Sequence, residues 1–290
     1  MTGGNGPGRN GPAGNGPGGN VPADAWANLR RHTPARIALG RSGGSLPTAE
    51  VLAFAAAHAQ ARDAVHLALD LAALAAALQA EHWPTLTVAS RAPDRNAYLR
   101  RPDLGRRVDA ASAERLAGWA ALNPPPDVAI VLADGLSALA AQRHGPDLLR
   151  HLRQALAGAL TLSPVVLATQ ARVALADEVG ALLHARAVLV LLGERPGLSS
   201  PDSLGAYLTV APRLGRSDAE RNCVSNIRPA GLACAAAAGR IAWLLREALR
   251  RGVTGIALKD DSATPLLASA TCSHTDRQTD SHPDSPVPRA

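Results

Sequence analysis

The chain has 290 residues, of which 47% are apolar and only 2% aromatic, and its formal net charge is +6. This length can bury one large core or two modest ones, and the scarcity of aromatic side chains predicts a core of Ala, Leu and Val with closely packed helices. The positive charge permits an anionic partner, but the arginines stand singly or in pairs without aromatic residues among them, which argues against nucleic-acid binding.

The cysteines and the apolar runs bear on the compartment. Cys223, Cys234 and Cys272 lack the paired spacing of a disulfide framework or of a structural zinc site, as is typical of a protein in a reducing cytosol. No apolar run reaches the roughly 20 residues that span a bilayer, and the N-terminus lacks the charged start and apolar stretch of a signal peptide. We therefore expect a soluble cytoplasmic protein with no membrane association and no metal site of its own.

Both ends of the chain differ in composition from its middle. Residues 1–22 repeat an Asn-Gly-Pro pentad and residues 263–290 are rich in Ser, Thr, Asp and Pro, so we expect a disordered tail at each end. Residues 23–126 carry mainly helical patterns, with one helix led by Pro47 and another from Ala110 to Leu122. The first part of the folded chain is therefore predicted to be a mainly helical N-terminal region.

The pattern changes after the triple proline at positions 124–126, which we take as a boundary. Three short apolar runs without alternation follow, and helical stretches with one apolar face separate them, as in a buried parallel sheet. The runs are Val128–Leu132, Val165–Ala168 and Ala187–Leu192. A fourth run at Ala206–Val210 and a long helix near Ala230–Arg250 come later. Residues 127–262 are thus predicted to form a Rossmann-like, doubly wound parallel-sheet domain, which makes the fold α/β.

Ligands of open α/β sheets bind at the carboxyl ends of the strands, so the loops after the three runs form the candidate site. These loops are Asp134–Ser137, Thr169–Val173 and Gly193–Leu198. Each loop alone also fits a simpler interpretation, in which Asp-Gly-Leu-Ser caps a helix and Arg172 and Arg195 are surface charges. The chain has no G-x-G-x-x-G fingerprint, P-loop or G-x-S-x-G elbow, and Cys223 has no histidine nearby in sequence. The residues predict a ligand crevice and leave its chemistry open.

Four stretches have a familiar order and spacing. They are Thr33–Gly43 with Arg62–His66, Asn96–Arg107, Asp127–Ser137, and the run from Gly193 to Gly231. The last two are the most specific, because G-E-R-P-G-L and R-N-C-V-S-N-I are not general sheet-loop patterns. Together these stretches resemble the small subunit of ethanolamine ammonia-lyase, a bacterial enzyme of ethanolamine catabolism, over roughly Thr33 to Asp261.

The resemblance implies a partner, a cofactor and three site residues. A larger, barrel-forming subunit would pair with this chain in a higher-order hetero-oligomer, with adenosylcobalamin held between the two. The family's cofactor contacts on the small subunit fall on Val173, Glu194 and Cys223. Ethanolamine would be deaminated to acetaldehyde and ammonia by radical chemistry that begins at the cobalt–carbon bond. Since the radical and substrate groups belong to the large subunit, we expect no catalytic residue on this chain, and cobalt enters only within the cofactor.

Three alternatives stay open at this point. Some family members begin with a targeting segment for a bacterial microcompartment, but the Gly-Asn-Pro repeat of this chain cannot form the amphipathic helix that such a segment needs. A non-enzymatic cobalamin-binding module or a basic nucleic-acid-binding module is the alternative to an enzyme subunit. Glu194 could accept a hydrogen bond from an amide or ribose hydroxyl of the cofactor, or instead form an ion pair with Arg195 or Arg213.

Overall fold

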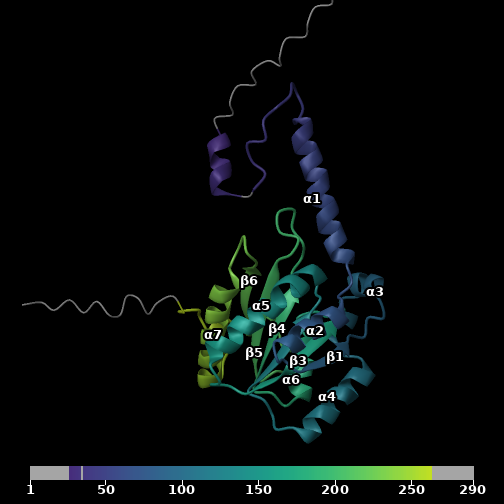
Figure 1. Ribbon diagram of the computed structural model, residues 1–290, viewed down its shortest axis with the longest axis vertical. Coiled ribbons are helices and arrows are strands. Elements are labelled where there is room, and N and C mark those ends of the chain that lie inside the picture. The colour runs from purple at the N-terminus through teal and green to yellow at the C-terminus, as the bar shows by residue number, and fades with distance from the viewer. Residues whose placement is uncertain (1–25, 34, 263–290) are drawn as a thin grey trace, which may run out of the picture.

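A six-stranded sheet with helices on both faces forms the body of the protein (Figure 1), of which the computed structural model describes residues 26–33 and 35–262. The strand order is β1-β3-β2-β4-β5-β6. β1 to β4 run parallel to one another, while β5 and β6 are antiparallel to their neighbours. The strands are β1 (Thr85–Ala89), β2 (Val128–Ala133), β3 (Leu162–Thr169), β4 (Ala187–Gly193), β5 (Leu204–Val210) and β6 (Asn222–Ile227).

Alternate side chains of the central strand β2 point into two separate cores. Ile130 and Leu132 pack with α2, α5 and α7 on one face, whereas Ala129 and Val131 pack with α4 and α6 on the other. Because both faces are covered, every residue of β2 is buried and the strand reads as a continuous apolar run. The helices are α1 (Thr48–His66), α2 (Leu71–Ala80), α3 (Arg95–Arg100), α4 (Ala110–Leu122), α5 (Ala138–Leu156), α6 (Leu175–Leu182) and α7 (Cys234–Arg251).

The predicted α/β class, the four predicted strands and the five predicted helices are confirmed. Two strands were missed. β1 lies within the region predicted to be helical and pairs with β3 at the edge of the sheet, and its short Thr-Leu-Thr-Val-Ala sequence has no long apolar run. β6 has few apolar residues, and its Cys223, Ser225 and Asn226 are exposed. The boundary at residues 126 and 127 stays a prediction, and the two predicted tails lie outside the described residues.

The two neighbouring strands β2 and β3 lead into helices on opposite faces of the sheet. The connection from β2 passes through α5 on one face, and the connection from β3 passes through α6 on the other. Parallel crossovers are right-handed, so a chain that reverses its direction across the sheet must change face at this point. The loops after β2 and β3 therefore separate, and a crevice is expected between them at the carboxyl edge.

Helix α1 leaves this body and extends away from it (Figure 1). Among its residues only Ala64 is buried. Within the described part of the chain, no single helix is both long and apolar enough to cross a membrane; only α1 and α2 taken together pass that test, and they are bent by 81° relative to each other.

A buried ion pair joins β6 to α6. The guanidinium of Arg221 donates to both carboxylate oxygens of Asp177, at 2.6 and 2.7 Å, and also to the hydroxyl of Thr209 at 3.1 Å. The side chains of Arg221 and Asp177 are only 3% and 2% exposed. Since Arg221 stands two residues before Cys223, this pair fixes the start of the strand that carries the thiol.

Replacement of Asp177 by alanine is expected to lower the free energy of unfolding by about 3 to 5 kcal/mol, because Arg221 would stay buried with only the exposed Asp218, at 3.5 Å, as a counter-charge. Urea denaturation measures the loss. The control is Asp103→Ala, whose carboxylate pairs with Arg101 in solvent and whose removal should change stability little. A loss for Asp177→Ala as small as that of the control would contradict the structural role of the buried pair.

Candidate functional site

A cavity of about 430 Å³ lies at the carboxyl edge of the sheet, on the side covered by α6. Five parts of the chain contribute to it: α3, the loop after β2, the loop after β3, the end of β4 with the loop that follows it, and the middle of β5. Its lining residues are Tyr98, Leu136, Arg172, Val173, Leu192, Gly193, Glu194, Arg195 and Tyr207. The cavity thus occupies the place that strand order and connection handedness predict for a ligand.

The carboxylate of Asp134 joins the ends of β2 and β3 behind this cavity. It accepts hydrogen bonds from the backbone N–H groups of Gln170 and Ala171, at 2.8 and 3.0 Å, and from the guanidinium of Arg95 at 3.4 Å. Asp134 is 2% exposed, and this burial raises the pKa of its carboxyl even though the N–H donors and Arg95 act in the opposite direction. Arg95 also donates to the carbonyl of Gly135 at 2.8 Å, so it spans the gap between the two loops.

Tyr98 forms the buried wall of the cavity on the α3 side. The guanidinium carbons of Arg95 and Arg172 lie 4.7 and 4.3 Å from the centre of its ring, and its hydroxyl donates to the carbonyl of Ala171 at 3.1 Å. Burial raises the pKa of Tyr98 to about 12, so the hydroxyl stays protonated. Gly105 allows this packing, because a Cβ there would lie 2.9 Å from Cγ of Arg172 and 3.0 Å from the Tyr98 ring.

Glu194 follows β4, and its carboxylate is held in place through one oxygen. Oε2 accepts hydrogen bonds from the hydroxyl of Ser203 and from the backbone N–H of Asn226 at 3.4 Å. Oε1 accepts no hydrogen bond from the described residues, and Glu194 is one of the residues that line the cavity. Neither Arg195 nor Arg213 forms an ion pair with Glu194 in the described part of the chain. The carboxylate therefore has structural support without a counter-charge.

The structure brings two of the three sequence-predicted site residues to one cavity. Val173 and Glu194 both line it, from the loops after β3 and β4. Cys223 is exposed on β6 and is not among the lining residues, but it lies directly opposite Tyr207, which does line the cavity. Burial raises the pKa of both the Cys223 thiol and the Tyr207 hydroxyl. Cys223 thus lies beside the site, next to its strand partner Tyr207.

The sequence did not single out the network of Arg95, Tyr98 and Asp134. Asp134 belonged to a loop that also fits a helix cap, and Ser137 does cap α5 by accepting from the N–H of Ala140. A charged residue directly after a fully apolar strand was the available signal for Asp134, since burial at that position requires hydrogen-bond partners. Arg172 is not a simple surface charge, because its Nη2 donates to the carbonyl of Tyr98 at 3.1 Å.

Comparison with known families decides the relationship. The model of the ethanolamine ammonia-lyase light chain matches residues 23–259. The chain belongs to this family. The small subunit of the enzyme from Xanthomonas campestris pv. campestris (strain B100) is 57% identical over 255 residues, which cover 87% of this chain and 93% of that protein. The small subunit from Pseudomonas syringae pv. tomato is 56% identical over 250 residues, 86% of this chain and 87% of that protein. The resemblance inferred from four stretches is therefore confirmed, and the family's enzyme is an ammonia-lyase.

Replacement of Asp134 by alanine should cost about 3 kcal/mol or more of stability, because the backbone N–H groups of Gln170 and Ala171 lose their acceptor and Arg95 loses its carboxylate partner. Hydrogen exchange at Gln170 and Ala171 should accelerate more than exchange in α7. Asp70→Ala is the control, because Asp70 accepts only one exposed N–H, that of Ala73, and should cost about 1 kcal/mol. Equal losses in the two variants would show that Asp134 does not hold the loops together.

Gly205 on β5 leaves the space that the Glu194 carboxylate occupies. A Cβ at Gly205 would lie 2.7 Å from Oε1 of Glu194, so Gly205→Ala should displace this carboxylate and lower stability by about 1 to 2 kcal/mol. The matched variant is Gly118→Ala in α4, where a Cβ meets nothing within 4 Å and should stabilise the helix by about 0.5 to 1 kcal/mol. A neutral or stabilising Gly205→Ala would mean that Glu194 does not depend on this gap.

Proposed function

We propose that this chain is the small subunit of an adenosylcobalamin-dependent ethanolamine ammonia-lyase, and that the cavity at the strand ends holds one edge of the cofactor against the large subunit. The observation that carries the proposal is the meeting of Val173 and Glu194 in one cavity. The family resemblance assigns both to the cofactor, and they reach the cavity from separate loops of a chain that belongs to the light-chain family. Location and family therefore support the same function.

The donors and acceptors of the cavity suit the outer edge of a corrinoid. The side-chain amides of such a cofactor are hydrogen-bond donors, and Oε1 of Glu194 is an acceptor without another partner among the described residues. Val173 contributes apolar contact, and the wall of Tyr98 and Arg172 keeps the loop that carries Val173 in position. When bound, adenosylcobalamin supplies a weak cobalt–carbon bond whose homolysis starts the radical deamination of ethanolamine to acetaldehyde and ammonia.

The size of the cavity supports a shared cofactor site. About 430 Å³ is the volume of a site for a drug-sized ligand, whereas a corrinoid is several times larger, so this chain can enclose only part of it. The rest of the cofactor would be enclosed by the large subunit, which is the partner that the name of the relatives implies. We place the assembled enzyme in the cytoplasm, with a microcompartment as the alternative location.

Co-expression with the large subunit tests the function as a whole. Acetaldehyde should form from ethanolamine only when both chains and adenosylcobalamin are present. If the large subunit is equally active without this chain, the chain is not an enzyme subunit. Cobalamin binding by this chain alone, with no effect on the large subunit, would favour a non-enzymatic cobalamin-binding module, and salt-sensitive binding to DNA would favour a basic nucleic-acid-binding module.

Glu194→Gln tests the placement of the cofactor. Loss of a charge-assisted hydrogen bond, worth roughly 1.5 to 3 kcal/mol, should weaken adenosylcobalamin binding to the assembled complex about tenfold or more. Spectroscopic titration of the complex measures the affinity, and size-exclusion chromatography checks that the complex is intact. The control is Glu114→Gln, an exposed glutamate on α4 that is not among the cavity residues. Unchanged cofactor affinity together with lower thermal stability would make Glu194 a structural residue.

A further inference from the structure

The segment before the body, residues 26–33 and 35–57, forms an arm with unusually exposed apolar side chains. Exposed fractions are 50% for Val51, 64% for Leu52 and 48% for Phe54, and three more large apolar residues of the arm, Leu29, Ile37 and Leu46, are also exposed. In Figure 1 the part of the arm that precedes α1 lies beside the N-terminal half of that helix, and the whole arm lies away from the sheet. Scattered exposed apolar residues are ordinary, but six of them within one short segment are a concentration that is typical of an interaction surface.

Apolar side chains point in all directions around the first half of α1, where Thr48 and Glu50 are the polar residues. Successive residues of an α-helix are about 100° apart, so the consecutive residues Val51, Leu52, Ala53 and Phe54 point in four directions around its axis. All four are exposed. A helix that packs against one neighbour has a single apolar stripe and a polar opposite face, whereas a helix that is apolar all round is enclosed. We therefore expect a partner to enclose the arm on all sides.

The contacts of the arm are with itself. Arg30 donates to Glu50 at 3.2 Å and to the carbonyl of Ile37 at 2.9 Å, and the guanidinium of Arg36 lies 5.3 Å from the centre of the Phe54 ring. Among the described residues from 28 to 57, every hydrogen bond and ion pair stays within the arm. The arm thus has a defined shape of its own, while the body provides no cover for its apolar side chains.

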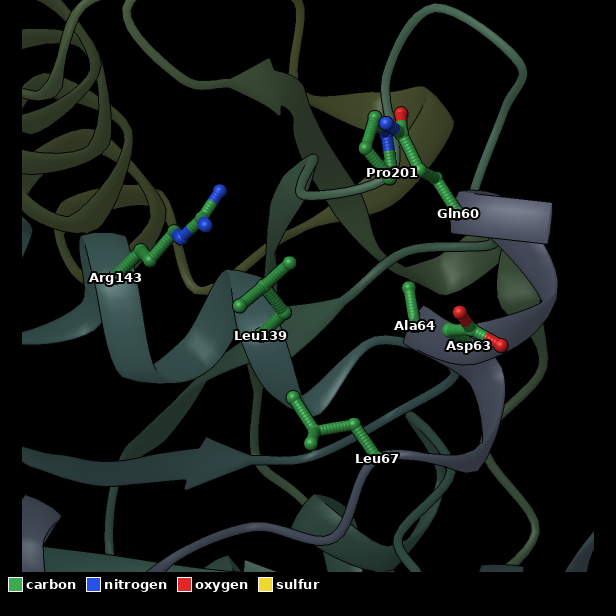
Figure 2. Close-up of a pocket in the computed structure, with 7 residues that line it drawn as sticks. All are labelled: Gln60, Asp63, Ala64, Leu67, Leu139, Arg143 and Pro201. Carbon is green, nitrogen blue, oxygen red and sulfur yellow. The ribbon is translucent and has the colours of Figure 1, made fainter. Parts of the chain in front are cut away.

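The arm joins the body at the edge where the proposed cofactor cavity lies. Figure 2 shows a pocket of about 410 Å³ between the second half of α1, the start of α5 and Pro201. Leu67, directly after α1, and Leu139 of α5 line it. The carbonyl of Pro201 accepts from the hydroxyl of Ser137 at 2.8 Å, and Ser203 in the same loop supports Glu194. A partner that closes the cavity would therefore also lie next to the base of the arm, where α1 joins the body.

We propose that the arm inserts into an apolar groove of the large subunit. This inference rests on the proposed function, because it takes the large subunit as the partner that closes the cavity. A second copy of this chain would pair its own α1 with this one and cover one side of each helix only. A larger partner with a groove can cover all sides, and the pocket at the base of the arm places it at the same edge as the shared cofactor.

The double variant Val51→Glu with Phe54→Glu tests the docking, since it places two charges at neighbouring exposed positions, i and i+3, of the first half of α1. Its affinity for the cognate large subunit, measured by titration of labelled full-length chain, should fall at least about 100-fold. The control is Leu122→Glu, which changes a side chain that is 86% exposed at the end of α4 and should bind as the wild type does. Circular dichroism melting should be unchanged in both variants, because neither site packs against the body.

The outcomes separate the two proposals. If the wild-type chain does not bind the large subunit, the proposed function fails. If the wild type binds and the double variant binds within threefold of it, the function stands and the docking of the arm is wrong. Two further measurements address other occupants: light scattering of the chain alone, and flotation with vesicles of phosphatidylglycerol and phosphatidylethanolamine. Self-association or vesicle binding that the double variant abolishes, without loss of affinity for the large subunit, would assign the arm to a second copy or to a membrane surface.

Discussion

The site depends on one buried carboxylate at the point where the sheet changes direction. β2 and β3 must send their connections to opposite faces, and this leaves two loops with unpaired backbone N–H groups at the same edge. Asp134 satisfies two of these groups, and Arg95 offsets its charge and reaches the loop after β2. The cavity is thus a consequence of strand order, and its shape is a consequence of the hydrogen bonds that hold the separated loops.

Close backbone contacts connect the loop after β2 to the end of β4, and so to Glu194. A Cβ at Gly135 would lie 2.1 Å from the carbonyl oxygen of Gly193, and a Cβ at Gly193 would lie 2.0 Å from that of Ser137. The N–H of Leu136 donates to the Gly193 carbonyl at 2.9 Å in the space so created. Since Gly193 directly precedes Glu194, the position of the carboxylate is fixed from the loop after β2. The loop after β2 and the end of β4 are therefore in direct backbone contact, although they are far apart in sequence.

Local pattern was enough to predict the central strands and most helices, because β2, β3 and β4 are covered on both faces and therefore read as apolar runs. It failed for β1 and β6, which are edge strands with exposed or polar residues. The same limit applies to the site. Val173 and Glu194 follow predicted strands and could be placed, whereas Tyr98 and Arg95 come from a short helix whose contacts depend on the tertiary fold. No local signal gives the partner of a long-range hydrogen bond.

Burial keeps three groups at and beside the cavity in their neutral, protonated forms. Burial raises the pKa of Tyr98 to about 12, and it also raises the pKa of Tyr207 and of the Cys223 thiol, so these three groups keep their protons near neutral pH. Such a wall offers fixed donors, one carboxylate acceptor and apolar surface, which is what a cofactor edge requires. An acid–base pair would need two groups with pKa values on either side of neutrality, and these residues are shifted away from it. The arrangement therefore supports the role that we propose for this chain, which is to position a cofactor whose reacting groups lie on the partner subunit.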